Sequence, residues 1–177
     1  MAPLPITLNR LKSLDRISIE LTNQCAKACS FCYNGSDPTG RLSWDEDELV
    51  GFVSDCAANG IKAVSFGGGE PLQYPSLFNV FKRLQGKLFR SMTSNGLLLD
   101  DAVDDLVSAA PNKVHISIHF PQDEREVERV TRQVNMLAAR GIKSGVNLLV
   151  ARSWLEAAEQ AAKYLNDNGI SNERIVY

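Results

Sequence analysis

The chain has 177 residues, of which 44% are hydrophobic and 23% charged, and its 19 basic and 21 acidic residues give a formal net charge of −2. This length predicts one domain with a substantial core. The charge balance does not favour nucleic-acid binding, which needs a basic excess or a basic face. The N-terminus lacks the apolar run of a signal peptide, and no stretch approaches the length of a membrane span. We therefore predict a cytoplasmic protein without a membrane contact.

Segments of strand and helix character alternate along the chain after an N-terminal extension, residues 1–14. Short runs of β-branched and large apolar residues predict strands over residues 17–21, 63–66, 88–93, 113–118, 144–150 and 174–177. Apolar periodicity and Gly or Pro stop signals predict helices over residues 43–60, 76–85, 100–109, 127–141 and 154–168. This alternation predicts parallel strands joined by right-handed crossovers.

The first predicted helix contains Cys56, a cysteine outside the cluster of three near the N-terminus. Ser43 and Glu46 form a capping-box pattern at its start, and Gly60 ends it. We expect Cys56 to be a small buried hydrophobic residue, because it belongs to the apolar stripe of this helix. That stripe consists of Leu49, Phe52, Val53, Cys56 and Ala57.

Two predicted strands are polar on one face and apolar on the other. In the fourth strand the polar residues are His115, Ser117 and His119, and in the first strand they are Ser18, Glu20 and Thr22. A strand with helices over both faces would be almost continuously apolar. We therefore favour a barrel, whose polar face lines a ligand-filled lumen, over a doubly wound open sheet.

The predicted architecture is a partial (β/α)6 TIM-like barrel of the α/β class, formed by residues 15–177. The last predicted strand, residues 174–177, is short, and no helix follows it. We therefore expect the barrel to be truncated within or just after its sixth strand. A C-terminal portion of the core domain would then be missing.

Three cysteines, Cys25, Cys29 and Cys32, follow the first predicted strand in the segment CAKACSFC. In α/β barrels the C-terminal ends of the strands form the active site. Thiolates suit zinc and iron–sulfur clusters, but a structural zinc site needs four protein ligands, and no fourth Cys or nearby His is available. A four-iron cluster normally takes four thiolates. Three would leave one iron open to an external ligand, and catalysis needs an open coordination position.

The CxxxCxxC spacing, with Phe31 before the last cysteine, resembles the signature of the radical S-adenosylmethionine (radical SAM) enzymes. Further motifs follow in an order and spacing similar to that family: Gly68-Gly69-Glu70-Pro71 after the second predicted strand, Ser94-Asn95-Gly96 at the end of the third, Ser117 late in the fourth and Asn147 on the fifth. The resemblance extends from about residue 15 to the end of the chain. It implies a [4Fe–4S] cluster, held by Cys25, Cys29 and Cys32, with SAM at its open iron.

The resemblance also implies SAM-binding roles for residues at the strand ends. Glu70, together with the flexible backbone of residues 67–69 that includes Gly68 and Gly69, would hold the amino group of SAM. Ser94 and Asn95 are further cofactor-binding candidates. The alternative for the glycines is a tight strand-to-helix turn without a ligand.

Other candidates would contact the rest of SAM. Ser117 and Asn147 offer a hydroxyl and an amide that suit the ribose hydroxyls and the SAM carboxylate. Phe31 and residues 148–150 could pack on the adenine. The alternatives are polar lumen residues that satisfy one another and simple packing of Phe31 within its loop.

The segment after the fourth predicted strand departs from some branches of the family, because their SID-type motif is Ser117-Ile118-His119 here. Relatives often supply an arginine for the SAM carboxylate from this region, and Arg125 and Arg129 are candidates. The glutamates around them, Glu124, Glu126 and Glu128, favour a solvated, charge-paired helix start instead. His115 and His119 face the predicted lumen, where each could touch SAM or substrate or be a hydrogen-bonded structural residue.

The resemblance implies a radical SAM enzyme that reductively cleaves SAM to methionine and a 5′-deoxyadenosyl radical, which abstracts hydrogen from a substrate. An external one-electron reductant of the flavodoxin or ferredoxin type would supply the electron. The family resemblance favours a peptide substrate, with a small metabolite or nucleotide as the alternative, and the charge disfavours a large RNA. A second hypothesis is an electron-transfer or SAM-binding iron–sulfur protein without radical catalysis.

Overall fold

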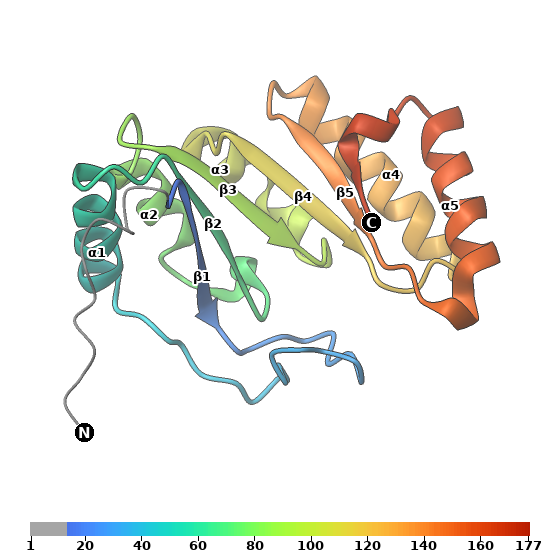
Figure 1. Cartoon of the computed structure of the whole chain (residues 1–177), viewed down its shortest axis with the longest axis horizontal. Helices are drawn as coiled ribbons and strands as arrows, with labels where there is room; N and C mark the ends of the chain where they lie inside the picture. Colours follow the sequence, from blue (N-terminus) through green and yellow to red (C-terminus); the bar gives the residue numbers. More distant parts are fainter. Residues whose placement is uncertain (1–13) are drawn as a thin grey trace.

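In the computed structural model, which describes residues 14–177, a six-stranded parallel sheet has helices packed along one face (Figure 1). The strands lie side by side in chain order. They are β1 (Arg16–Thr22), β2 (Ala63–Gly68), β3 (Phe89–Ser94), β4 (Lys113–Ile118), β5 (Ser144–Leu148) and β6 (Ile175–Val176). Apart from Leu14, the extension predicted over residues 1–14 lies outside the described residues.

A helix follows each of the first five strands. These helices are α1 (Glu46–Ala58), α2 (Leu77–Arg83), α3 (Leu99–Ala109), α4 (Glu124–Ala139) and α5 (Leu155–Asp167), with short 3₁₀ helices η2 (Pro71–Gln73), η3 (Arg152–Trp154) and η4 (Asn172–Arg174) between elements. The predicted α/β class with parallel strands is confirmed. The sheet is curved but open over the described residues, as a partial barrel requires (Figure 1).

No helix among residues 14–177 is both long and apolar enough to cross a membrane.

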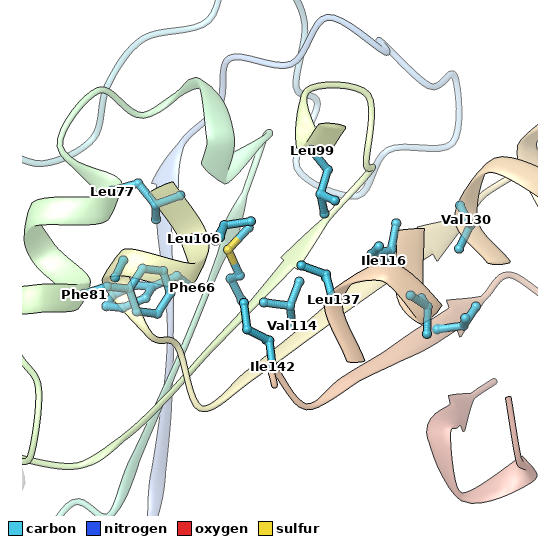
Figure 2. Packing of buried hydrophobic residues seen from close by; sticks show 14 of the residues in the cluster. Phe66, Leu77, Phe81, Leu99, Leu106, Val114, Ile116, Val130, Leu137 and Ile142 are labelled. Carbon is cyan, nitrogen blue, oxygen red and sulfur yellow. The ribbon is translucent and has the colours of Figure 1, made fainter. Parts of the chain in front are cut away.

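The hydrophobic core lies between the sheet and the helices (Figure 2). Phe66 of β2 and Phe81 of α2 meet edge to face, with ring centroids 5.4 Å apart, an arrangement that aromatic pairs prefer. Leu106 of α3 and Val114 of β4 are fully buried in the same cluster. Every second strand residue therefore faces the helices, as the apolar alternation predicts.

The opposite face of the sheet is polar. Ser18 and Glu20 of β1, Ser65 of β2 and Thr93 of β3 all line one cavity on this face, and the side chains of β1 there are exposed. The predicted separation of a polar lumen face from an apolar helix face is confirmed. This separation leaves the lumen free for a ligand while the core holds the sheet in place.

Helix α1 begins after Asp45, and the predicted capping box is wrong. The Asp45 carboxylate accepts hydrogen bonds from the backbone N–H groups of Asp47 at 2.8 Å and Glu48 at 3.4 Å. Ser43 instead donates its backbone N–H to the carbonyl of Leu21 at 3.0 Å, so it belongs to the extended chain beside β1. Asp is as good an N-cap as Ser, and the contact with β1 removes Ser43 from the helix start.

Cys56 is half-buried, so the prediction of a fully buried residue is wrong. The face of α1 that meets the core consists of Leu49, Val50 and Val53. Phe52, which the predicted stripe includes, is 45% exposed. The helix is therefore rotated relative to the predicted stripe, and Cys56 lies at the edge of its buried face.

Replacing Leu106 by Ala tests the placement of the core. Leu106 is 0% exposed, so Leu106→Ala should lower the free energy of unfolding by about 2–5 kcal/mol, through lost burial and the cavity left behind. Chemical denaturation followed by circular dichroism measures this value. The matched control is Leu155→Ala at a 50% exposed position, where we expect a change of about 0.5 kcal/mol or less. Equal losses in both variants would contradict the assigned core.

Candidate functional site

A cavity of about 660 Å³ opens on the polar face of the sheet. Its wall contains the three cysteines of the loop after β1 and residues that end or follow the neighbouring strands. The predicted site residues in the wall are Cys25, Cys29, Phe31, Cys32, Gly68, Gly69, Ser94, Asn95, Ser117 and Asn147. The fold therefore gathers most of the predicted site residues around one space, whereas Glu70, His115, Arg125 and Arg129 are not part of its wall.

The loop that contains the cysteines, residues 23–36 and hereafter the cysteine loop, is fixed by backbone hydrogen bonds. The N–H of Cys25 donates to the carbonyl of Asp37 at 2.8 Å. The N–H of Ala26 donates to Gln73 Oε1 at 2.9 Å, which links this loop to η2. The loop has little regular structure, so these contacts define its path.

Ala28 adopts a left-handed backbone conformation immediately before Cys29, with φ of 45°. This conformation costs an L-residue other than glycine on the order of 1 kcal/mol, and such residues cluster at functional sites. The N–H of Cys32 then donates to the carbonyl of Cys29 at 3.0 Å. The resulting tight turn brings both cysteines to the cavity wall.

Cys32 lies in a turn that favours its thiolate. Burial opposes ionisation, but the backbone N–H groups of Ser36, Asn34 and Gly35, together with the Ser36 side chain, bond to the sulfur. Their combined effect lowers the pKa of the Cys32 thiol below its usual value. Hydrogen bonds of this kind stabilise the charged form.

The other two cysteines have different surroundings. Burial raises the pKa of the Cys29 thiol, and the positive charge of Lys27 only partly offsets that rise. The sulfur of Cys25 accepts a hydrogen bond from Asn95 Nδ2 at 3.5 Å. Hydrogen-bond donors therefore surround the sulfurs of Cys25 and Cys32, whereas Cys29 experiences mainly burial and the charge of Lys27.

The segment at the end of β2, residues 67–70 and hereafter the glycine loop, packs directly on the start of the cysteine loop. Gly69 donates its N–H to the carbonyl of Thr22 at 2.5 Å, and Glu70 donates its N–H to the carbonyl of Gln24 at 2.8 Å. Gly68 has φ of 107°, and a Cβ there would overlap the carbonyl oxygen of Thr22. The segment is therefore a tight turn, and it also lines the cavity.

Glu70 faces the end of β3 and is 1% exposed. Its carboxylate accepts hydrogen bonds from the Leu72 N–H at 3.0 Å, the Ser94 hydroxyl at 2.8 Å and the Asn95 N–H at 2.8 Å. Burial raises the pKa of Glu70 against the opposing effect of these donors. The carboxylate thus connects the glycine loop, η2 and the end of β3.

The two histidines differ in their relation to the cavity. His119 lines it, whereas His115 is on the same face of β4 as Ser117 but packs beside Gly145 of β5 and is not part of the cavity wall. Burial lowers the pKa of each to about 4, and the charge of Lys27 adds to this effect at His119. Both imidazoles are therefore neutral near pH 7.

The start of α4 is only partly the solvated segment that its charges predict, because Glu124 and Glu128 are exposed but Glu126 is not. Arg125 is exposed, but Glu126 is 6% exposed. Arg129 is half-buried and donates from Nη2 to the carbonyl of Asn95 at 3.2 Å. Glu126 forms a 2.6 Å ion pair with Lys27, which is not among the predicted site residues. The one sequence feature that could have indicated a role for Lys27 is its position between Cys25 and Cys29.

Phe31 belongs to a group of aromatic rings at the edge of the cavity. Its ring centroid lies 5.6 Å from that of Phe120 and 6.2 Å from that of Trp154. Phe31 is also 40% exposed and lines the cavity. Phe31 can therefore pack against these rings and still present part of its surface to a ligand in the cavity.

Residues 19–177 match the family model of the radical SAM superfamily. The chain belongs to the radical SAM superfamily. The resemblance based on the cysteine spacing and the Gly-Gly-Glu-Pro segment is therefore confirmed. Enzymes of this superfamily use a [4Fe–4S] cluster and SAM.

Curated relatives of this radical SAM chain are named for a nucleotide reaction. GTP 3′,8-cyclase of Chlorobaculum tepidum is 30% identical over 125 residues, which cover 69% of this chain and 38% of that protein. A probable GTP 3′,8-cyclase of Metallosphaera sedula is 24% identical over 177 residues, which cover 93% of this chain and 56% of that protein. The chain thus spans about two fifths of the first and little more than half of the second.

Solved radical SAM structures share the fold. Streptococcus suis SuiB bound to S-adenosylmethionine has a TM-score of 0.75 at 17% identity, over 90% of this chain and 40% of that chain. The anSMEcpe structure with bound AdoMet has a TM-score of 0.66 at 17% identity, over 87% of this chain and 49% of that chain. The predicted fold class is therefore confirmed.

The donor chemistry of this radical SAM chain fits an iron–sulfur cluster. Three thiols line one cavity, thiolates are the usual ligands of such clusters, and hydrogen bonds to the sulfurs tune them. Among residues 14–177, no three His, Cys, Asp or Glu side chains lie close enough together to hold a single metal ion. The three cysteines remain the proposed cluster ligands.

Replacing Glu70 by Gln tests the buried carboxylate. The amide group has an NH₂ in place of one oxygen, so at least one of the three donors loses its acceptor. Leaving a buried donor unsatisfied should lower the free energy of unfolding by about 1–3 kcal/mol. Thermal or chemical denaturation measures the change. The control is Glu159→Gln at an exposed position on α5, which should have almost no effect; an equally stable Glu70→Gln protein would contradict the described network.

Proposed function

We propose that this chain is the catalytic core of a radical SAM enzyme, in which Cys25, Cys29 and Cys32 hold a [4Fe–4S] cluster and SAM occupies the cavity beside them. The observation that carries the proposal is that all three cysteines and the glycine loop line the same cavity. Three protein thiolates leave one iron of a four-iron cluster without a protein ligand. The amino and carboxylate groups of SAM would complete the coordination of that iron.

The glycine loop would hold the methionine part of SAM. Gly68 and Gly69 let the main chain approach a ligand closely, and the carbonyl groups of residues 67–69 can accept hydrogen bonds from the SAM ammonium group. A carboxylate offers about four acceptor positions, and Glu70 uses three of them within the protein. One acceptor position remains by this count. Glu70 is 1% exposed and is not among the wall residues, so its proposed direct contact with SAM requires the wall to open at Glu70.

The remaining wall residues would hold the nucleoside part of SAM. Ser117 and Asn147 present a hydroxyl and an amide suited to the ribose hydroxyls and the SAM carboxylate, and both line the cavity. Asn95 and Ser94 complete the polar wall at the end of β3. Phe31 would pack on the adenine together with the segment after β5, of which Leu148 and Leu149 line the cavity.

The bound cofactors would supply the one-electron reductive cleavage of SAM to methionine and a 5′-deoxyadenosyl radical that abstracts hydrogen from the substrate. The protein's part is to position SAM and to exclude water, which would allow side reactions. Phe31, Ile118 and Leu148 give the wall apolar surface for this purpose. An external one-electron reductant of the flavodoxin or ferredoxin type would supply the electron.

For the substrate we propose a small nucleotide. The relatives named GTP 3′,8-cyclase support this class and do not support the peptide that the resemblance alone favours. SuiB bound to its precursor peptide SuiA is 17% identical, so its likeness concerns the fold. The lumen also suits a nucleobase, since Glu20 and the hydroxyls of Ser18 and Thr93 line it, and a carboxylate can accept hydrogen bonds from a base amino group.

The cluster ligands can be tested by replacing one cysteine. Cys29→Ala should lose most of the iron and sulfide that the wild-type chain takes up in anaerobic reconstitution, because two thiolates hold a four-iron cluster poorly. The matched control is Cys56→Ala, since Cys56 lies on α1 and outside the cavity wall. Iron content equal to wild type in Cys29→Ala would refute the assignment of Cys29.

The reaction can be tested with the reconstituted protein. After anaerobic reduction and addition of SAM, we expect 5′-deoxyadenosine, measured by chromatography, and faster formation with GTP than with a peptide or without substrate. Deuterium transfer from labelled nucleotide to 5′-deoxyadenosine would identify the hydrogen donor. An intact, reducible cluster that gives no 5′-deoxyadenosine would favour the electron-transfer or SAM-binding alternative. Stimulation by the peptide alone would overturn the proposed substrate class.

A further inference from the structure

Lys27 lies between two of the proposed cluster cysteines, and its side chain is buried. Its Nζ is 2.6 Å from Glu126 Oε1 and 3.0 Å from Nδ1 of His119. The same ammonium group lies over the ring of Phe120, 5.3 Å from the centroid, which is a cation–π arrangement. The side chains of Lys27 and Glu126 are 11% and 6% exposed. Such residues are almost never this buried unless they are paired, so this ion pair differs from an ordinary surface pair.

Glu126 connects the ion pair to the barrel wall. It lies in the first turn of α4, and its Oε1 also accepts the backbone N–H of His119 at 2.7 Å. One carboxylate oxygen therefore contacts both the cysteine loop and the turn between β4 and α4, although Lys27 and Glu126 are 99 positions apart in the sequence. Backbone hydrogen bonds fix the start of the cysteine loop, and this contact adds a side-chain restraint at Lys27.

The charges of the pair also lie close to the proposed cluster ligands. Lys27 is two residues from both Cys25 and Cys29 in the sequence. Lys27 shares the cavity wall with Cys29. The potential of an iron–sulfur cluster depends on nearby charge and hydrogen bonding. A nearby cation favours the more negative reduced cluster, and a nearby anion disfavours it.

We propose that Lys27 and Glu126 act together as positioning residues for the cluster: the pair holds the cysteine loop against the turn between β4 and α4, and because its two charges balance, it does so without shifting the reduction potential. This inference rests on the proposed function, because it requires the cluster. Removing one partner leaves the other charge buried and unpaired, whereas removing both removes both charges. The two single variants should therefore have opposite electrostatic effects.

The test uses Lys27→Met, Glu126→Gln and the double variant, each reconstituted anaerobically and titrated by electron paramagnetic resonance in the absence of SAM. Lys27→Met should lower the midpoint potential, and Glu126→Gln should raise it. We expect each to change the reduction equilibrium by about tenfold, or about 59 mV for a one-electron couple. The double variant should return close to the wild-type potential. Purely structural damage would not produce shifts of opposite sign.

Cluster retention gives a second measurement that is independent of catalysis. Each single variant should lose iron to a chelator several-fold faster than wild type, because an unpaired buried charge weakens the hold on the cysteine loop. The double variant should lose iron more slowly than either single variant. If the single variants lose the cluster too quickly for titration, this recovery in the double variant supports the pair, and its absence overturns it.

The matched control is Lys62→Met. Lys62 pairs with Asp15 at the opposite end of the strands, with exposures of 76% and 65%, so its removal should change neither the potential nor iron retention. Single variants that shift the potential in the same direction, or not at all, would overturn the inference while the wild-type cluster stands. A wild-type chain that takes up no iron would refute the proposed function itself.

Discussion

The site depends on the carboxylate of Glu70. Burying a charged group is unfavourable unless hydrogen bonds replace its water, and Glu70 is 1% exposed. The Leu72 N–H in η2 and the Ser94 hydroxyl and Asn95 N–H at the end of β3 supply those bonds. The side chain of Asn95 then donates to the sulfur of Cys25. One buried carboxylate therefore fixes two neighbouring strand ends and orients a donor toward a proposed cluster ligand.

The glycine loop extends this control to the cysteine loop. Its N–H groups donate to the carbonyls of Thr22 and Gln24, which lie within three residues before Cys25. A side chain at Gly68 or Gly69 would overlap these same carbonyl oxygens. The absence of side chains thus allows two backbones to touch, and that contact determines where the cysteine loop leaves β1. The same glycines leave their main chain available to a ligand in the cavity.

The sequence predicts best what depends on local pattern. The fourth predicted strand coincides with β4, because polar and apolar residues alternate through it, whereas the fifth continues two residues beyond β5, because the apolar run outlasts the strand pairing. The cysteine spacing together with the Gly-Gly-Glu-Pro segment predicts the family that residues 19–177 match. Contacts between distant segments give no such pattern: the glutamates of α4 predict a solvated start, yet Glu126 is buried against Lys27, 99 positions away. The helix start at Asp45 is missed for a related reason, since the contact of Ser43 with β1 is tertiary.

Two kinds of group surround the proposed cluster cysteines: hydrogen-bond donors, which are dipoles, and the charged pair of Lys27 and Glu126. Three thiolates would place three negative charges in one wall. Backbone N–H groups stabilise the charge at Cys32, and the Asn95 side-chain amide stabilises the charge at Cys25. Lys27 is the one lysine or arginine that lines the cavity among residues 14–177, and Glu126 neutralises it. Fixed dipoles stabilise a thiolate without adding net positive charge. A neutral pair can therefore anchor the loop without raising the potential of the cluster, and a low potential is what electron transfer into SAM requires.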